Sequence, residues 1–121
     1  MASRTPPANS IADIPDRART EGPFSPLFHV AAELVGRRWT GAILFALAHG
    51  MHRFSELEAA IPGLSARLLT ERLRELEGAD IVEREPQDGG TRWSYRLTEK
   101  GDALRPVMMA LNRWAVDWSD S

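Results

Sequence analysis

Residues 53–78, RFSELEAAIPGLSARLLTERLRELEG, decide the fold of this 121-residue chain. Ser55 is a good helix N-cap, and the glutamate three residues after it would complete a capping box. Pro62 and Gly63 end this helix at about residue 60, and Ser65 caps a second helix. Two helices joined by so short a connection predict a helix-turn-helix.

The second of these helices has one apolar and one polar face. Its apolar face carries leucines at spacings of four and three, namely Leu69, Leu73 and Leu76. Helical geometry turns the remaining side chains away from them, with two more residues at the exposed N-terminus. The polar set is Ser65, Ala66, Arg67, Thr70, Glu71 and Arg74.

Two strand-like runs follow, at residues 81–85 and 92–97. Between them, Gln87-Asp88-Gly89-Gly90 contains an Asp-Gly-Gly core, which is a strong turn signal. The pattern predicts a β-hairpin over about 81–97. A hairpin placed after a helix-turn-helix is a wing, so the expected fold is a mainly α member of the α+β class.

Two further helices are expected before the helix-turn-helix. The first runs from Pro26 to Gly36 and the second from about Arg38 to Ala48, with Gly50 as a stop signal. Their apolar positions recur at helical spacing: Leu27, Val30, Ala31 and Leu34, then Trp39, Ile43, Leu44 and Leu47. The short segment 51–54 could pair as a strand.

The last helix is expected over about 98–118, capped by Thr98. It carries two neighbouring apolar stripes, one of Leu104, Met108, Leu111, Ala115 and Trp118 and one of Val107, Ala110 and Trp114. This is more apolar surface than one small domain covers, which indicates a partner chain. Pro106 lies inside the pattern, so we expect a kink near residue 102 or a break after which Pro106 restarts the helix.

Composition limits the domain organisation, the chemistry and the location to be expected of this chain. Residues 1–23 are rich in proline and polar side chains, which predicts a disordered tail ahead of one domain over 24–121. Cysteine is absent, so these residues offer no disulfide, thiolate ligand or thiol nucleophile. The sequence shows no secretory signal and no apolar run of membrane-spanning length, so a cytoplasmic location is expected. The formal net charge of −2 means that any nucleic-acid contact must be a local basic patch.

Five segments in fixed order and spacing resemble the HxlR family of the MarR-like winged-helix superfamily. They are Gly36-Arg37-Arg38-Trp39-Thr40, Arg53-Phe54-Ser55-Glu56-Leu57, Ile61-Pro62-Gly63-Leu64-Ser65, Leu69-Thr70-Glu71-Arg72-Leu73-Arg74-Glu75-Leu76 and Tyr95-Arg96-Leu97-Thr98-Glu99-Lys100-Gly101. The resemblance extends from about Ser25 to Trp114. It implies a winged helix-turn-helix homodimer that regulates nearby genes, with dimer contacts made by the first and last helices. The interface residues expected on this basis are Leu27, Phe28, Leu104, Met108, Leu111, Trp114 and Trp118.

One position departs from the family pattern. Many members have a cysteine before the proline that opens the first helix, and this chain has Ser25-Pro26. A serine hydroxyl cannot form the thiolate through which such members sense oxidants and electrophiles. Direct cysteine sensing is therefore not expected here.

The polar face of the helix after Ser65 is the candidate DNA site. An α-helix fits the major groove, and arginine makes paired hydrogen bonds to guanine. Arg67 is the best candidate base reader among Ser65, Ala66, Arg67, Thr70 and Arg74. The alternative interpretation is a solvated face with Arg–Glu pairs, and Glu71 on that face is unfavourable near phosphates.

Two arginines outside this helix complete the candidate site. The resemblance places Arg53 at the DNA backbone, and a surface salt bridge to Glu56 is the equal alternative. Arg92 follows the hairpin turn, where a basic side chain could contact phosphate or enter the minor groove, although Asp88 at the tip weakens this case.

Other functions find less support. His49 and His52 straddle a helix end and lack a third ligand of defined spacing, so no metal or other cofactor is expected. The sequence contains no phosphate-binding loop, no thiol and no nucleophile elbow, so an enzyme is not expected. The expected function is a DNA-binding transcription regulator that represses from a pseudo-palindromic operator. A small apolar ligand held between its first and last helices could control it. A winged helix that binds protein instead of DNA is the alternative.

Overall fold

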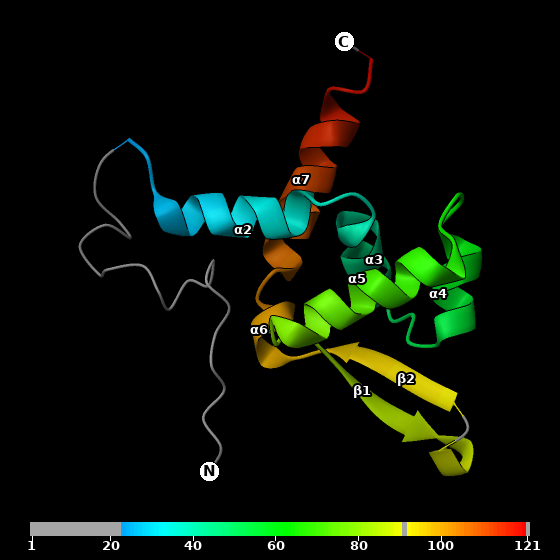
Figure 1. Cartoon of the computed structure of the whole chain (residues 1–121). Coiled ribbons are helices and arrows are strands. Elements are labelled where there is room, and N and C mark those ends of the chain that lie inside the picture. Colours follow the sequence, from blue (N-terminus) through cyan, green and yellow to red (C-terminus); the bar gives the residue numbers. More distant parts are fainter. Residues whose placement is uncertain (1–22, 91, 121) are drawn as a thin grey trace. The chain divides into compact units, whose positions relative to one another are not determined.

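The computed structural model describes residues 23–90 and 92–120, apart from the side chain of Asp88 (Figure 1). It divides into two units, residues 1–38 and residues 39–121. The tail predicted for residues 1–23 lies outside the described residues except for Pro23.

The first unit contributes helix α2, Pro26–Gly36, over the predicted range. The Ser25 hydroxyl oxygen caps it by accepting a hydrogen bond from the Phe28 backbone N–H at 3.2 Å, and Pro26 opens the first turn, where no backbone donor is needed. Ser25, the residue that departs from the family pattern, thus serves here as a helix cap.

The helices of the second unit are α3, Thr40–Ala48, α4, Phe54–Ala60, and α5, Ala66–Gly78. Their buried side chains form the core together with residues from the hairpin: Ile43, Leu44, Leu57, Leu69, Leu73, Leu76, Ile81 and Val82. The second helix, expected from about Arg38 to Ala48, ends as predicted but begins two residues after Arg38, at Thr40, because Trp39 has a left-handed φ of 79°.

The predicted capping box at Ser55 was wrong. Helix α4 begins at Phe54, and Arg53 is its extended N-cap residue, so Ser55 lies inside the first turn. The reason is tertiary: Arg53 forms a β-bridge with Ser94, and the Tyr95 N–H donates to the His52 carbonyl at 2.7 Å. This bridge confirms that the segment 51–54 pairs with a strand, and the helix starts where the pairing ends.

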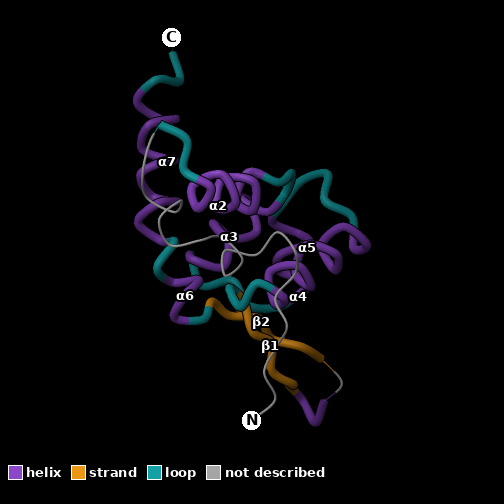
Figure 2. Tube along the Cα trace, turned by 60° about the vertical axis from the view of Figure 1, so that its left-hand side comes forward, coloured by secondary structure: helices purple, strands orange, loops and turns teal. Residues whose placement is uncertain are grey.

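The wing is an antiparallel hairpin of β1, Val82–Gln87, and β2, Arg92–Leu97, with a short 3₁₀ turn, η2, at Asp88–Gly90. Its register runs from Val82 opposite Leu97 to Gln87 opposite Arg92. The predicted hairpin is confirmed. In Figure 2 it projects from the helical part of the second unit.

The last helix is divided, as one of the two alternatives for Pro106 predicted. Helix α6 spans Glu99–Asp102 and α7 spans Arg105–Asp117, with Pro106 in the first turn of α7. Thr98 caps α6, because its Oγ1 accepts from the Gly101 N–H at 3.0 Å. The same hydroxyl donates to the Asp80 carbonyl at 2.6 Å, which ties α6 to the start of the wing. Among the helices of the described residues, none is long and apolar enough to span a bilayer.

Candidate nucleic-acid interface

Helix α5 presents the predicted polar face to solvent. Leu69, Leu73 and Leu76 are buried, whereas Arg67 and Arg74 are exposed. Ala66 and Glu71 are exposed too, and Thr70 is half-buried. The helix therefore has the two faces that a DNA-reading helix requires, one for the core and one for the groove.

Two hydroxyls of the site already serve the helix itself. The Ser65 Oγ accepts from the Leu68 N–H at 3.1 Å, which satisfies a donor of the first turn. The Thr70 Oγ1 donates to the Ala66 carbonyl at 2.8 Å. Ser65 can still donate its hydroxyl hydrogen to a phosphate, and Thr70 can still accept from a base amino group.

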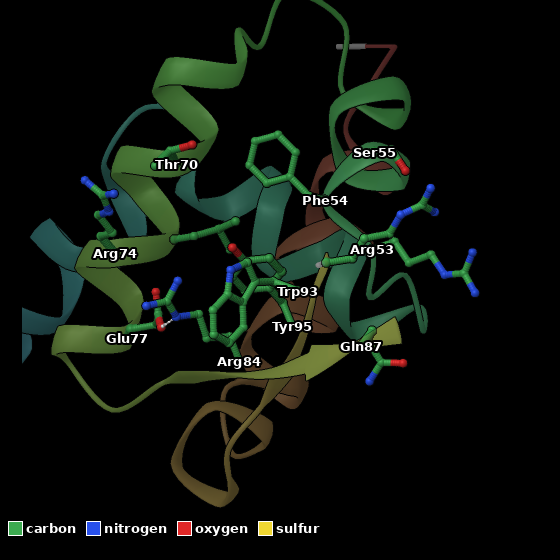
Figure 3. A pocket seen from close by; sticks show the side chains of 12 residues that line it. Arg53, Phe54, Ser55, Thr70, Arg74, Glu77, Arg84, Gln87, Trp93 and Tyr95 are labelled. Atoms are coloured by element: carbon green, nitrogen blue, oxygen red, sulfur yellow. Dashed lines mark ion pairs between the residues drawn. The ribbon is translucent and has the colours of Figure 1, made fainter. Parts of the chain in front are cut away.

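A hollow of about 550 Å³ lies between α5, the wing and the start of α4 (Figure 3). Its lining combines cationic and aromatic side chains: Arg53, Phe54, Ser55, Thr70, Leu73, Arg74, Glu77, Arg84, Gln87, Arg92, Trp93 and Tyr95. Four of the predicted residues, Arg53, Thr70, Arg74 and Arg92, thus meet around one hollow. The other three, Ser65, Ala66 and Arg67, do not line it and lie in and before the first turn of α5.

Arg84, which was not among the residues predicted from the sequence, also lines this hollow. Its Nε lies 3.1 Å from Glu77 Oε1 on α5, and its guanidinium carbon lies 4.2 Å from the centroid of the Trp93 ring on β2. The available signal was strand alternation, since Arg84 stands opposite Tyr95 in the hairpin and opposite residues share a face. Burial, followed by the charge of Glu77, raises the pKa of the Tyr95 phenol, so Tyr95 is a neutral wall of the hollow.

The other face of the wing has a different character. Glu83 stands opposite Arg96, and their carboxylate oxygen and guanidinium Nε are 2.7 Å apart. Glu85 stands opposite Ser94 on the same face. The wing therefore carries Arg84, Trp93 and Tyr95 on the face that lines the hollow, whereas Glu83 and Arg96 neutralise each other on the other face.

Arg53 had two expected roles, a contact to the DNA backbone and a surface salt bridge to Glu56. Its Nε is 3.8 Å from Glu56 Oε1, which is a long contact between two largely exposed side chains. Such pairs are worth little in water. Arg53 can exchange this partner for a phosphate at small cost.

The histidine pair has protein partners. The ring Nδ1 of His49 is 2.8 Å from the Phe45 carbonyl oxygen, and that of His52 is 3.2 Å from the Ser94 hydroxyl oxygen. Within the part of the chain that the structure describes, no group of three or more metal-ligating side chains gathers.

The residues expected at a dimer interface differ in exposure. Met108 is 5% exposed and is already buried within its own domain, and Leu27 and Leu104 are half-buried. Four others project large apolar surfaces to solvent: Phe28 at 73%, Leu111 at 59%, Trp114 at 62% and Trp118 at 61%.

A helix-turn-helix followed by a β-hairpin, with arginines along the outward helix, defines a winged helix-turn-helix transcription regulator. Comparison with known proteins agrees. The chain belongs to the HxlR-like helix-turn-helix family, whose model matches residues 34–121. This is a family of DNA-binding transcription regulators and not of enzymes.

Relatives in Bacillus subtilis (strain 168) include YvaP and YodB, both named HTH-type transcriptional regulators, YvaP as uncharacterized. YvaP is 44% identical over 96 residues, which cover 78% of this chain and 89% of YvaP. YodB is 42% identical over 91 residues, covering 74% of this chain and 81% of YodB.

Solved structures show the same fold. The reduced form of YodB matches with a TM-score of 0.69 and 40% identity, covering 78% of this chain and 94% of that structure. The reduced form of the redox regulator HypR matches with a TM-score of 0.72 and 32% identity, over 79% of this chain and 95% of HypR.

Proposed function

We propose that this regulator acts as a homodimeric repressor, in which α5 of each protomer enters the major groove at one half of a pseudo-palindromic operator. The observation that carries the proposal is the outward face of α5, where Arg67 and Arg74 are exposed on the side opposite the buried leucines. Half-sites would lie about one helical turn, or a multiple of it, apart.

The side chains divide into two roles. Arg67, near the N-terminus of α5, reads base edges, with Ser65, Ala66 and Thr70 beside it. Arg53 and Arg92, which both line the hollow, bind phosphates and fix the register of the protein on the duplex. Arg74 lines the hollow too, on the α5 side.

Dimerisation is supported by the apolar surface of α7. Leu111, Trp114 and Trp118 are all more than half exposed in the single chain. Aromatic side chains at such density are typical anchors of protein interfaces. We assign this face, with Phe28 of α2, to contact with a second copy.

The signal that releases DNA is proposed to be a small apolar ligand. Exposed aromatic side chains on α2 and α7 support this assignment. The residue at the cysteine position, Ser25, is engaged as a helix cap, and the 121 residues contain no cysteine. Release through a thiol of these residues is therefore not part of the proposal.

The test measures binding of the protein to the DNA upstream of its own gene and to scrambled DNA of equal length over a salt series. We expect tighter binding to the upstream DNA and a steep loss of affinity with salt for both. Equal affinity for the two DNAs rules out sequence-specific regulation. Absence of salt-dependent binding to either favours a winged helix that binds protein.

A matched control uses arginines of the same hairpin. Replacing Arg92 by Ala removes a cation that lines the hollow, whereas replacing Arg96 by Ala removes one that pairs with Glu83 and does not line the hollow. Both changes alter the net charge equally. The first should weaken DNA binding and the second should not.

A further inference from the structure

Arg84 connects the wing to helix α5. It belongs to β1, contacts the Glu77 carboxylate of α5 at 3.1 Å, and lies over the Trp93 ring of β2 at 4.2 Å. Figure 3 shows its side chain extended between these two groups, with the ion pair to Glu77 drawn as a dashed line. One guanidinium thus connects both strands of the wing to α5.

The charge of Arg84 is largely compensated in this position. Among the described side chains that line the hollow, Glu77 is the only acidic one, and it is paired with Arg84 rather than with Arg53, Arg74 or Arg92. Its side chain is 25% exposed, against 45% for Arg84. A guanidinium held by a carboxylate and an indole has fewer donors left for a phosphate than one that extends into solvent.

The pairing also explains why an acidic residue occupies a surface that DNA approaches. A carboxylate at this position repels phosphates, and simple electrostatics would remove it. The Glu77 carboxylate has a second effect, because its ion pair with Arg84 holds the base of the wing against the last turns of α5. Besides this link, the wing is held at its base by the buried Val82 and Tyr95 and by the bridge between Ser94 and Arg53.

We propose that Arg84 is a positioning residue, which with Glu77 and Trp93 holds the wing at a set distance from α5 so that both contact one duplex, and that it is not itself a phosphate contact. This rests on the proposed DNA binding. It assigns Glu77 a favourable effect on DNA affinity despite its charge.

The decisive experiment compares two substitutions of the same kind on α5, Glu77→Gln and Glu71→Gln, on a non-specific duplex. Each removes one negative charge from the helix, and Glu71 is exposed one turn and a half nearer the N-terminus. Loss of repulsion should tighten binding of the E71Q protein about two- to fivefold. The E77Q protein should bind about three- to tenfold more weakly, because its wing is no longer held.

The salt dependence separates positioning from direct contact. Arg84→Met keeps an apolar stem over Trp93 but removes the charge, so affinity should fall at every salt concentration with an unchanged slope. Arg92→Ala should lower the slope of log K against log salt by about 1, as expected for one lost phosphate contact. If E77Q binds more tightly, as E71Q does, or if R84M lowers the slope as R92A does, then Arg84 is a DNA contact and the proposal is wrong.

A measurement without DNA keeps this inference separate from the proposed function. Amide hydrogen exchange of the hairpin, residues 82–87 and 92–97, should accelerate in both E77Q and R84M and stay at the wild-type rate in E71Q. Unchanged exchange in E77Q overturns the positioning role. If the wild-type protein fails to bind any DNA, the proposed function fails, and the exchange rates alone decide whether Arg84 holds the wing.

Discussion

The indole ring of Trp39 packs directly over Gly63, the glycine of the helix-turn-helix turn. A Cβ placed on Gly63 would lie 3.2 Å from the Trp39 Cη2 atom. Both residues have a left-handed backbone, with φ of 79° at Trp39 and 84° at Gly63. The contact ties the residue before α3 to the turn that sets the angle between α4 and α5.

Replacing Gly63 by Ala should destabilise the domain for two reasons. The added methyl group meets the indole ring, and a residue with a Cβ is strained at positive φ. Together we expect a loss of about 2–3 kcal/mol in the free energy of unfolding, measured by urea denaturation. Gly50→Ala is the control, because Gly50 has φ +92° with nothing within 4 Å, so only the backbone strain of about 1 kcal/mol should appear. Equal losses in the two proteins would show that the Trp39 contact contributes nothing.

Replacing Gly101 by Ala tests the contact between α6 and the start of the wing. A Cβ at Gly101 would lie 2.0 Å from the Ile81 carbonyl oxygen, and this neighbour is backbone that cannot rotate away. The loss should be at least about 3 kcal/mol, seen as a lower Tm. In contrast, Gly78→Ala meets nothing within 4 Å and should stabilise α5 by about 0.5–1 kcal/mol. A G101A protein as stable as wild type would mean that α6 does not approach Ile81 so closely.

The helix-turn-helix could be predicted because its signals are local. The leucines of α5, the Ser65 cap and the Thr98 cap each depend on residues within one or two turns, and all three are present in the structure. The missing backbone donor of Pro106 predicted either a kink or a break, and the structure has the break. Long-range contacts did not alter these local features in the structure.

The wrong cap predicted at Ser55 and the missed role of Arg84 have a different cause. Ser55 lost its capping role to a bridge between Arg53 and Ser94, which are far apart in the sequence. Arg84 gained its role only when the hairpin brought it beside Glu77 and Trp93. Such positions depend on how segments meet, so propensity and periodicity indicate at most which face a side chain occupies.

Arg67→Ala tests the proposed base reader. Because Arg67 is exposed at the N-terminal end of α5 and lies outside the hollow, its loss should leave stability unchanged within about 0.5 kcal/mol. Specific binding should weaken by about 1–3 kcal/mol, with relaxed preference at one base pair per half-site. A footprint followed by binding to single-base operator variants measures this. Uniform weakening on every DNA would instead make Arg67 a phosphate contact.

Trp114→Ala and Met108→Ala should affect different equilibria. Met108 is buried within its own domain, so its truncation should lower the free energy of unfolding by about 2–5 kcal/mol. Trp114 is mostly exposed in the single chain, so its truncation should weaken a dimer by about 2 kcal/mol or more. Sedimentation equilibrium gives the dimer dissociation constant, and denaturation of the dissociated protein gives the stability of the chain. A wild-type protein that stays monomeric at micromolar concentration would contradict the interface on α7.

Tyr95 should report on the wing through its titration. Burial, then the nearby Glu77 charge, raises the pKa of its phenol above the ordinary value of 10.0. It is the only tyrosine in the sequence, so ultraviolet absorbance of the phenolate follows it directly. A raised folded-state pKa contributes stability that is complete below pH 10.0 and is lost as the pH rises through the folded-state value. Stability of the wild-type protein should therefore fall above pH 10.0 more steeply than that of Tyr95→Phe.

Glu77→Gln removes one of the two main causes of the raised Tyr95 pKa, so it should move the absorbance midpoint toward the ordinary value. A midpoint that does not move would show that the carboxylate does not act on the phenol.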